Sequence, residues 1–117
     1  METGCVSISP RIVKKSWGEE IWLINEPEYC FKILNLNKGS AGSLHYHPKK
    51  KETFIVIGGK VKIEYDHKVY KLKVGTKPLT IYPNIPHRFT GLKESRILEV
   101  STHHDDSDVV RIEESRK

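Results

Sequence analysis

The chain has 117 residues, which is enough for one domain with one hydrophobic core and too few for two ordinary domains. Hydrophobic residues make up 37% and charged residues 30% of the sequence, proportions that exclude a disordered chain. No apolar run approaches the roughly 20 residues that a membrane-spanning helix needs. The first residues lack an apolar stretch behind a positive segment, so we expect no secretory signal and a cytoplasmic location.

The net charge of +5 raises the question of nucleic-acid binding, because Lys and Arg neutralise phosphates. These residues are spread along the chain, often at alternating positions such as Lys71 and Lys73, which is typical of a solvated strand face. We therefore predict no nucleic-acid partner, no membrane partner and a small anionic ligand. Cys5 and Cys30 lie far apart without a metal-binding spacing, so we expect free thiols.

In chain order, the first element is an N-terminal arm at residues 1–14. Its apolar residues recur at alternating positions: Val6, Ile8 and Ile12. This spacing predicts an edge strand, or one exchanged with a neighbouring molecule. Because a free strand edge is a natural pairing surface, we expect a homodimer.

From Tyr29 onward, short segments alternate apolar and polar residues between Gly, Pro or Asn, the pattern of antiparallel strands with one buried face. The predicted strands are 31–36, 43–46, 53–57, 60–65, 70–74, 79–82, 87–90 and 96–101. A turn at Asp66 and His67 joins two of them into a hairpin with its apolar side inward. No segment keeps a helical period for three turns, so the pattern predicts an all-β sandwich or barrel. We place this domain at 15–112 and a flexible tail at 113–117.

Two histidines one residue apart, followed by a glutamate, lie in the stretch from Gly39 to Gly59. Residues i and i+2 of a strand point to the same side, so His45 and His47 face one point together. Glu52 opens the next strand and can bring a carboxylate oxygen to that point. Imidazole and carboxylate ligands suit Zn, Mn, Fe, Ni or Co, so the sequence predicts one divalent metal ion of open identity.

A fourth ligand is predicted in a distant turn. Pro83 and Asn84 form a tight turn in which Asn tolerates positive φ, and Pro86 fixes the backbone just before His87. Taken alone, His87 would more often be an ordinary partly buried histidine. In company with the other three residues, it completes a set of four metal ligands.

These residues carry a family resemblance. Five of them keep the spacing of the first cupin motif: Gly39, His45, His47, Glu52 and Gly59. The stretch from Gly75 to His87 resembles the second motif, and the likeness extends over about residues 15–111. The resemblance implies a single cupin domain, a jelly-roll barrel also called a double-stranded β-helix, with the three histidines and Glu52 as metal ligands.

A narrower likeness is to the cupin domain of type II mannose-6-phosphate isomerases. Four segments carry it in order: KKSWGEEIW, SLHYHPKKKETFIVIGGKV, YPNIPHRF and ILEVSTHHDDSDVVRIEE. Within them, Lys50 matches a position usually held by Arg in that family. This resemblance implies a metal-dependent isomerase whose substrate is a sugar or sugar phosphate.

An aldose-ketose isomerase moves a proton between adjacent carbons, using a metal to polarise substrate oxygens and a carboxylate to carry the proton. We expect that carboxylate to be Glu52, acting as ligand and base, or Glu99, if its strand points it inward; the alternative for Glu99 is a rim carboxylate paired with a lysine. Lys50 and Arg88 are candidates for binding a substrate phosphate. Trp17 could stack on a sugar, although a buried tryptophan that closes the barrel is the commoner outcome.

Three classes of function remain open. We favour a metal-dependent sugar or sugar-phosphate isomerase or epimerase. The same ligands also suit an iron-dependent dioxygenase, or a non-catalytic carbohydrate-binding or sensing module. His103 and His104 precede acidic residues in a polar stretch, so we expect them in an exposed loop.

Overall fold

The computed structural model describes residues 10–117, and every helix or strand in this part of the chain is a β-strand. The prediction of an all-β protein is confirmed. In chain order the strands are β1 (Arg11–Lys15), β2 (Gly18–Asn25), β3 (Cys30–Leu36), β4 (Leu44–Tyr46), β5 (Glu52–Gly58), β6 (Lys60–Tyr65), β7 (Lys68–Lys73), β8 (Leu79–Ile81), β9 (His87–Gly91), β10 (Ser95–Ser101) and β11 (Val110–Glu113). A helix able to span a membrane does not occur among the described residues.

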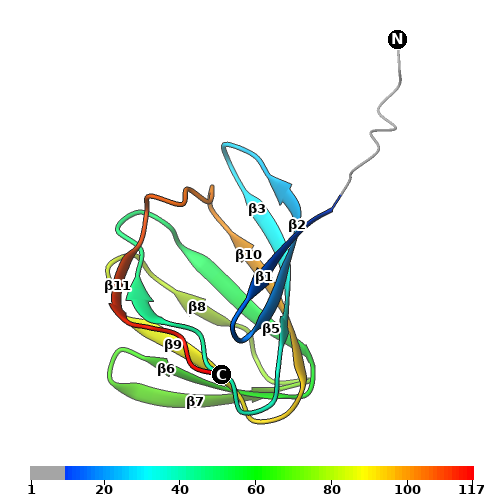
Figure 1. The fold of residues 1–117 in the computed structure, drawn as a ribbon. Coiled ribbons are helices and arrows are strands. Elements are labelled where there is room, and N and C mark those ends of the chain that lie inside the picture. Colours follow the sequence, from blue (N-terminus) through cyan, green and yellow to red (C-terminus); the bar gives the residue numbers. More distant parts are fainter. Residues whose placement is uncertain (1–9) are drawn as a thin grey trace.

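The strands form two antiparallel sheets that face each other in a jelly-roll sandwich (Figure 1). The six-stranded sheet has the order β1-β2-β3-β10-β5-β8, and the five-stranded sheet has the order β11-β4-β9-β6-β7. Strands that are distant in sequence, such as β3 and β10 or β4 and β9, are therefore direct neighbours. This topology brings the two histidine-containing segments of the sequence together.

The core follows from strand alternation. In β3 every second residue, beginning at Cys30, is buried, and side chains of this inward set meet those of the opposite sheet. The core cluster is apolar, and its members include Leu34, Leu36, Phe54, Val61, Ile63 and Ile97. Trp17 packs edge-on against Phe89, with ring centroids 4.9 Å apart. Both rings also line the cavity described below, so the core ends where that cavity begins.

β6 and β7 form the predicted hairpin. Asp66 and His67 have φ angles of 54° and 61°, as a two-residue turn between twisted strands requires. Val61 and Ile63 are fully buried, as expected. Val74, which we expected on the same inward face, lies beyond the end of β7 and is 61% exposed.

Two strands, β2 and β11, were not predicted from the sequence pattern. Most of β2 is partly exposed, so no clean alternation marks it, and β11 is exposed along its whole length. The predicted flexible tail at 113–117 in fact begins inside β11, and Arg116 exchanges main-chain hydrogen bonds of 2.7 and 2.8 Å with Ala41. Ordered structure therefore extends to Arg116.

The predicted N-terminal arm is described only from residue 10 onward. Arg11–Lys15 form β1, the edge strand of the six-stranded sheet, which pairs with β2 of its own chain. Val6 and Ile8, on which the prediction of an alternating strand also depended, lie outside the described residues, as does Cys5. Cys30 is a buried free thiol.

Candidate metal centre

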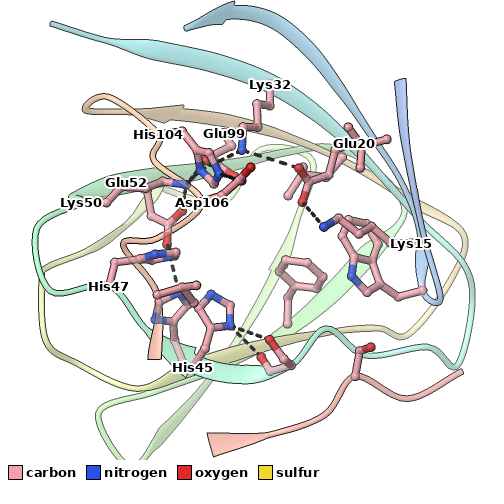
Figure 2. A pocket seen from close by; sticks show the side chains of 18 of the residues that line it. Lys15, Glu20, Lys32, His45, His47, Lys50, Glu52, Glu99, His104 and Asp106 are labelled. Atoms are coloured by element: carbon pink, nitrogen blue, oxygen red, sulfur yellow. Dashed lines mark hydrogen bonds and ion pairs between the residues drawn. The ribbon is translucent and has the colours of Figure 1, made fainter. Parts of the chain in front are cut away.

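A cavity of about 490 Å³ is lined by side chains from both sheets (Figure 2). It contains all but one of the candidate site residues from the sequence: Trp17, His45, His47, Lys50, Glu52, His87 and Glu99. The exception is Arg88, which does not line it.

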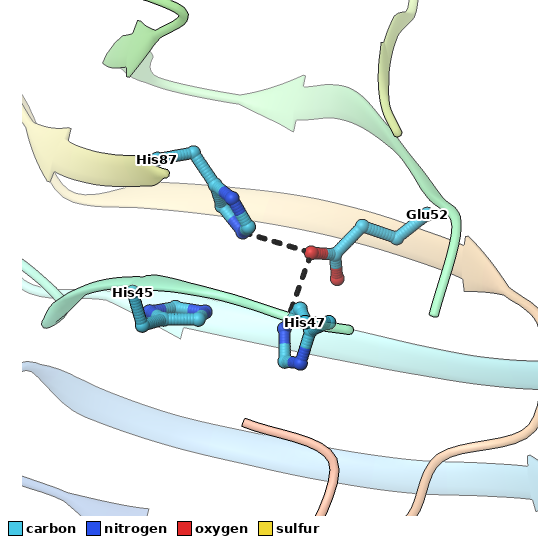
Figure 3. A group of neighbouring side chains, drawn as sticks. All are labelled: His45, His47, Glu52 and His87. Carbon is cyan, nitrogen blue, oxygen red and sulfur yellow. Dashed lines mark ion pairs between the residues drawn. The ribbon is translucent and has the colours of Figure 1, made fainter. Parts of the chain in front are cut away.

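The four predicted metal ligands converge in this cavity. His45 in β4 lies directly opposite His87, the first residue of β9. His47 follows β4 by one residue, and Glu52 begins β5 in the other sheet. One candidate ligand atom of each residue lies within 4.8 Å of all the others, and Figure 3 shows the imidazoles and the carboxylate gathered around a common point.

The main chain fixes how the three imidazoles are protonated. The Nδ1 atoms of His45, His47 and His87 lie 3.0, 2.7 and 2.9 Å from carbonyl oxygens. Those carbonyls belong to Ser43, Asp108 and Ile85, respectively. Because a carbonyl oxygen can only accept, each Nδ1 carries a hydrogen, which leaves Nε2 as the ring atom available to a metal ion. Metal-binding histidines in proteins are oriented in this way.

The donor atoms fit a divalent metal. Glu52 Oε2 and His87 Nε2 are buried and lie 2.9 Å apart, yet neither has a well-formed hydrogen bond. Burial and the neighbouring imidazoles lower the pKa of His45 to about 3, so its ring is neutral and free to bind a cation. Neutral imidazoles and one carboxylate with unsatisfied atoms are ligands of transition metals, so this cluster could hold a metal ion.

A buried lysine connects two carboxylates beside the cluster. Lys50 is 3% exposed, and its Nζ lies 3.3 Å from Glu52 Oε1 and 2.7 Å from Glu99 Oε2. Burial alone would lower the pKa of Lys50, but the two carboxylates outweigh burial and raise it. Both carboxylate oxygens of Glu52 therefore have close neighbours: Oε2 lies beside the imidazoles, and Oε1 lies beside Lys50. Glu99 lies inside the cavity rather than at its rim, and it is paired with a lysine as the alternative interpretation expected.

Asp108 holds the loop that carries His47 and Lys50, and sequence reasoning gave it no individual role. Its carboxylate accepts hydrogen bonds from the main-chain N–H groups of Lys49 and Lys50, at 2.9 and 3.0 Å. Its carbonyl oxygen accepts the bond from His47 Nδ1. One residue from the segment before β11 thus positions both a ligand and its neighbour.

A second polar group, which was not predicted from the sequence, lies in the same cavity. Lys32 points inward from β3 and is 1% exposed; its Nζ lies 3.5 Å from Glu20 Oε1 and 3.1 Å from His104 Nδ1. We expected His104 in an exposed loop, but only His103 is exposed, because the chain after β10 turns His104 into the cavity. The signal for Lys32 was its place among the inward positions of β3, between Cys30 and Leu34.

Arg88 does not face the cavity, so the expected role in phosphate binding is not supported. It is 4% exposed and donates three hydrogen bonds, to the carbonyl oxygens of Gly42 and Glu114 and to the Glu113 carboxylate. The side chain thereby ties the C-terminal segment to β9. Trp17 is 5% exposed and lines the cavity floor with Phe89, which agrees with the commoner outcome of a buried tryptophan.

Acidic and basic side chains balance around the cavity. The basic ones are Arg11, Lys15, Lys32, Lys50 and Arg111, and the acidic ones are Glu20, Glu52, Glu99, Asp106 and Glu114. A bound divalent cation would make the cavity electropositive, which favours an anionic or electron-rich ligand.

Comparison with known proteins agrees with this architecture. The cupin domain family matches residues 32–101, a segment that runs from β3 to the end of β10 and contains all four candidate ligands. The chain belongs to the cupin family. No curated protein matches the sequence.

Several solved structures share the cupin fold. KdgF from Halomonas sp. is 16% identical with a TM-score of 0.70, over 76% of this chain and 81% of that one. Streptomyces Pac13, described as a nucleoside dehydratase, is 10% identical with a TM-score of 0.78, over 92% and 91%. CapF from Staphylococcus aureus, described as a capsular polysaccharide assembling protein, is 18% identical with a TM-score of 0.78; the match covers 93% of this cupin but only 33% of CapF. At these identities the likeness shows the fold alone.

Proposed function

We propose that this cupin is a metal-dependent isomerase or epimerase that acts on a small sugar or sugar phosphate. The observation that carries the proposal is the buried carboxylate of Glu99, which lies in the same cavity as the four-ligand cluster and is joined to it through Lys50. The cavity thus combines a place for a Lewis acid with a separate group that can accept a proton.

His45, His47, Glu52 and His87 would hold the metal. When bound there, a divalent metal would polarise the carbonyl and hydroxyl oxygens of a substrate. In the isomerase reaction, Glu99 would accept a proton from the carbon beside the carbonyl and return it to the former carbonyl carbon, while the proton of the neighbouring hydroxyl passes to the former carbonyl oxygen, which leaves the carboxylate as it began. Lys50 holds Glu99 in place through their 2.7 Å ion pair.

Two further points support a sugar-derived substrate. The likeness to type II mannose-6-phosphate isomerases covers both motif segments of the sequence. In addition, two of the structural neighbours carry names that refer to sugar-containing molecules, a nucleoside for Pac13 and a polysaccharide for CapF.

The test combines metal analysis with proton exchange. Elemental analysis of the purified protein identifies the metal, and incubation with mannose 6-phosphate and other sugar phosphates in D₂O is followed by NMR. We expect deuterium at the carbon next to the carbonyl and a coupled-assay signal for the isomer. Glu99→Gln should abolish exchange while keeping the metal, whereas exposed Glu28→Gln should leave both unchanged.

Either of two outcomes would reject the isomerase and favour a different function. Iron together with substrate-dependent oxygen consumption would identify a dioxygenase. Saturable sugar binding without exchange or turnover, for every sugar phosphate tested, would identify a binding or sensing module.

A further inference from the structure

Lys32 is the most deeply buried charged side chain of the cavity, and the chemistry proposed above does not use it. The strand ladders place it opposite Trp22 of β2 on one side and Glu99 of β10 on the other. These three residues form one row across the inner face of the sheet. A buried ammonium at the centre of such a row needs anionic or polar partners, because burying an unpaired charge is costly.

The partners of Lys32 are shared with other groups. Its nearest carboxylate oxygen, Glu20 Oε1, is 3.5 Å away and already accepts a 2.8 Å hydrogen bond from Trp22 Nε1. The face of the Trp22 ring also lies against the ammonium group. The distance from Lys32 Nζ to the ring centroid is 4.0 Å, which is a cation–π contact. Lys32 therefore has one long ion pair where a buried ammonium has three hydrogens to satisfy.

His104 does not make up the difference. Its Nε2 lies 2.9 Å from the Asp106 carboxylate and so donates, which leaves Nδ1 as a single acceptor. Both Lys32 Nζ and Lys50 Nζ approach that one atom, at 3.1 and 3.2 Å. Two ammonium groups thus compete for one lone pair, and one N–H is left over in the cavity.

The surplus donor lies within reach of the metal cluster. From Lys32 Nζ, contacts of 3.1, 3.2 and 3.3 Å lead through His104 and Lys50 to Glu52. One small molecule can therefore touch both ends. The five basic and five acidic side chains around the cavity balance with Lys32 included, so the negative charge of a ligand oxyanion beside Lys32 would be offset by the divalent cation that the four-ligand cluster could hold.

We propose that Lys32, backed by Trp22 and His104, is the subsite for an oxyanion of the substrate, a carboxylate or a phosphate, whose other end reaches the four-ligand cluster. The catalytic meaning of this subsite rests on the proposed isomerase function, but the binding of an oxyanion does not. Lys32 takes the place in anion recognition that the sequence assigned to Arg88.

Calorimetry on the metal-loaded protein tests the subsite with three matched sugars: mannose 6-phosphate, mannuronate and neutral mannose. We expect at least one anionic sugar to bind about tenfold more tightly than mannose or better. Lys32→Met and Lys32→Gln remove the charge with little change in volume and should abolish that advantage, leaving mannose affinity unchanged. Lys38→Met, at an exposed position, should behave as wild type. The preferred anion distinguishes phosphate from carboxylate.

Circular dichroism and metal content establish that each variant is folded and loaded, and two substitutions are used so that one folded variant is available. The subsite is disproved if wild type binds mannose as tightly as both anions, or if neither Lys32 variant lowers anion affinity. Anion binding that depends on Lys32, combined with no deuterium exchange for any sugar, would keep the subsite and reject the isomerase.

Discussion

Each of the three candidate histidine ligands is oriented by a main-chain carbonyl at its Nδ1. The identity of the histidines could be predicted, because the spacing of His45 and His47 on a strand places both rings on one side. The carbonyl that orients His47 could not, because it belongs to Asp108, which lies 61 positions away in the sequence. Such long-range contacts follow from the fold and leave no local pattern.

Replacing Asp108 tests this orienting role. In Asp108→Ala the main-chain N–H groups of Lys49 and Lys50 lose their acceptor, and the loop bearing His47 loosens. We expect metal affinity to fall by about 10- to 100-fold and stability to fall by about 1–3 kcal/mol. Metal titration calorimetry and urea unfolding measure the two effects. Asp105→Ala, which removes only contacts to Ser107, is the control, and equal metal affinity in both variants would contradict the prediction.

Lys32 shows why part of the site was missed. Its inward position was visible in the alternation of β3, but a lysine in an apolar strand is ordinarily assigned to the solvent face. His104 was missed for a different reason, because the direction of a polar loop after β10 depends on contacts such as that with Asn25, not on local sequence. Residues with a motif spacing could thus be found in advance, and residues placed by loops could not.

At the scale of elements, turns and buried strands were the most predictable features. Asn84 has a φ of 68°, as its place after Pro83 suggested, and its N–H binds the carbonyl of His47, so this turn joins the two motif segments. β2 and β11 were not predicted, because exposed strands are defined by their partners rather than by alternation. The domain limits drawn at 15 and 112 cut through β1 and β11 for the same reason.

The turn between β5 and β6 allows a matched test of backbone and packing effects. Gly59 has a φ of 74°, and a Cβ there would lie 2.2 Å from the Glu94 carbonyl oxygen; Gly75 has a φ of 92° but open space around it. Gly75→Ala should cost about 1–2 kcal/mol from backbone strain alone. Gly59→Ala should lower stability by clearly more, because the start of β10 must also move to make room for the added Cβ. Chemical denaturation compares them, and similar losses of stability would refute the role of close packing at Gly59.

At the scale of the whole molecule, the candidate ligands connect the two sheets. His45 and His87 belong to the five-stranded sheet, whereas Glu52 belongs to the six-stranded sheet. A cation bound to all of them would hold the sheets together and would be released on unfolding. Metal binding should therefore stabilise the folded state of the entire domain.

Metal removal provides the measurement. At a free metal concentration 100 times Kd, binding stabilises the protein by about 2.7 kcal/mol, which corresponds to a rise in Tm of roughly 10 °C. We expect chelation to lower Tm by this amount and re-addition to restore it. His45→Ala should abolish the response, whereas His103→Ala, which alters an exposed residue, should retain it. If the Tm of the wild-type protein is the same with and without metal, the proposed metal centre is contradicted.

The outer edge of β1 motivates the remaining prediction. β1 is an edge strand, and Ile12 within it is 58% exposed. Pairing of this edge with a second copy would cover it, so we expect a homodimer. Light scattering at micromolar concentration should give twice the chain mass of 13.5 kDa. A mass of one chain would show that β1 remains unpaired in solution.

The closing residues of the chain form part of the cavity wall. Arg88 anchors Glu113 and Glu114, Arg116 pairs with Ala41, and Ser115 lines the cavity and lies 2.7 Å from the hydroxyl of Ser16. Digestion by a carboxypeptidase would therefore do more than shorten a terminus. Removing Glu114 and Ser115, which line the cavity, would open it further to bulk solvent around the candidate metal ligands.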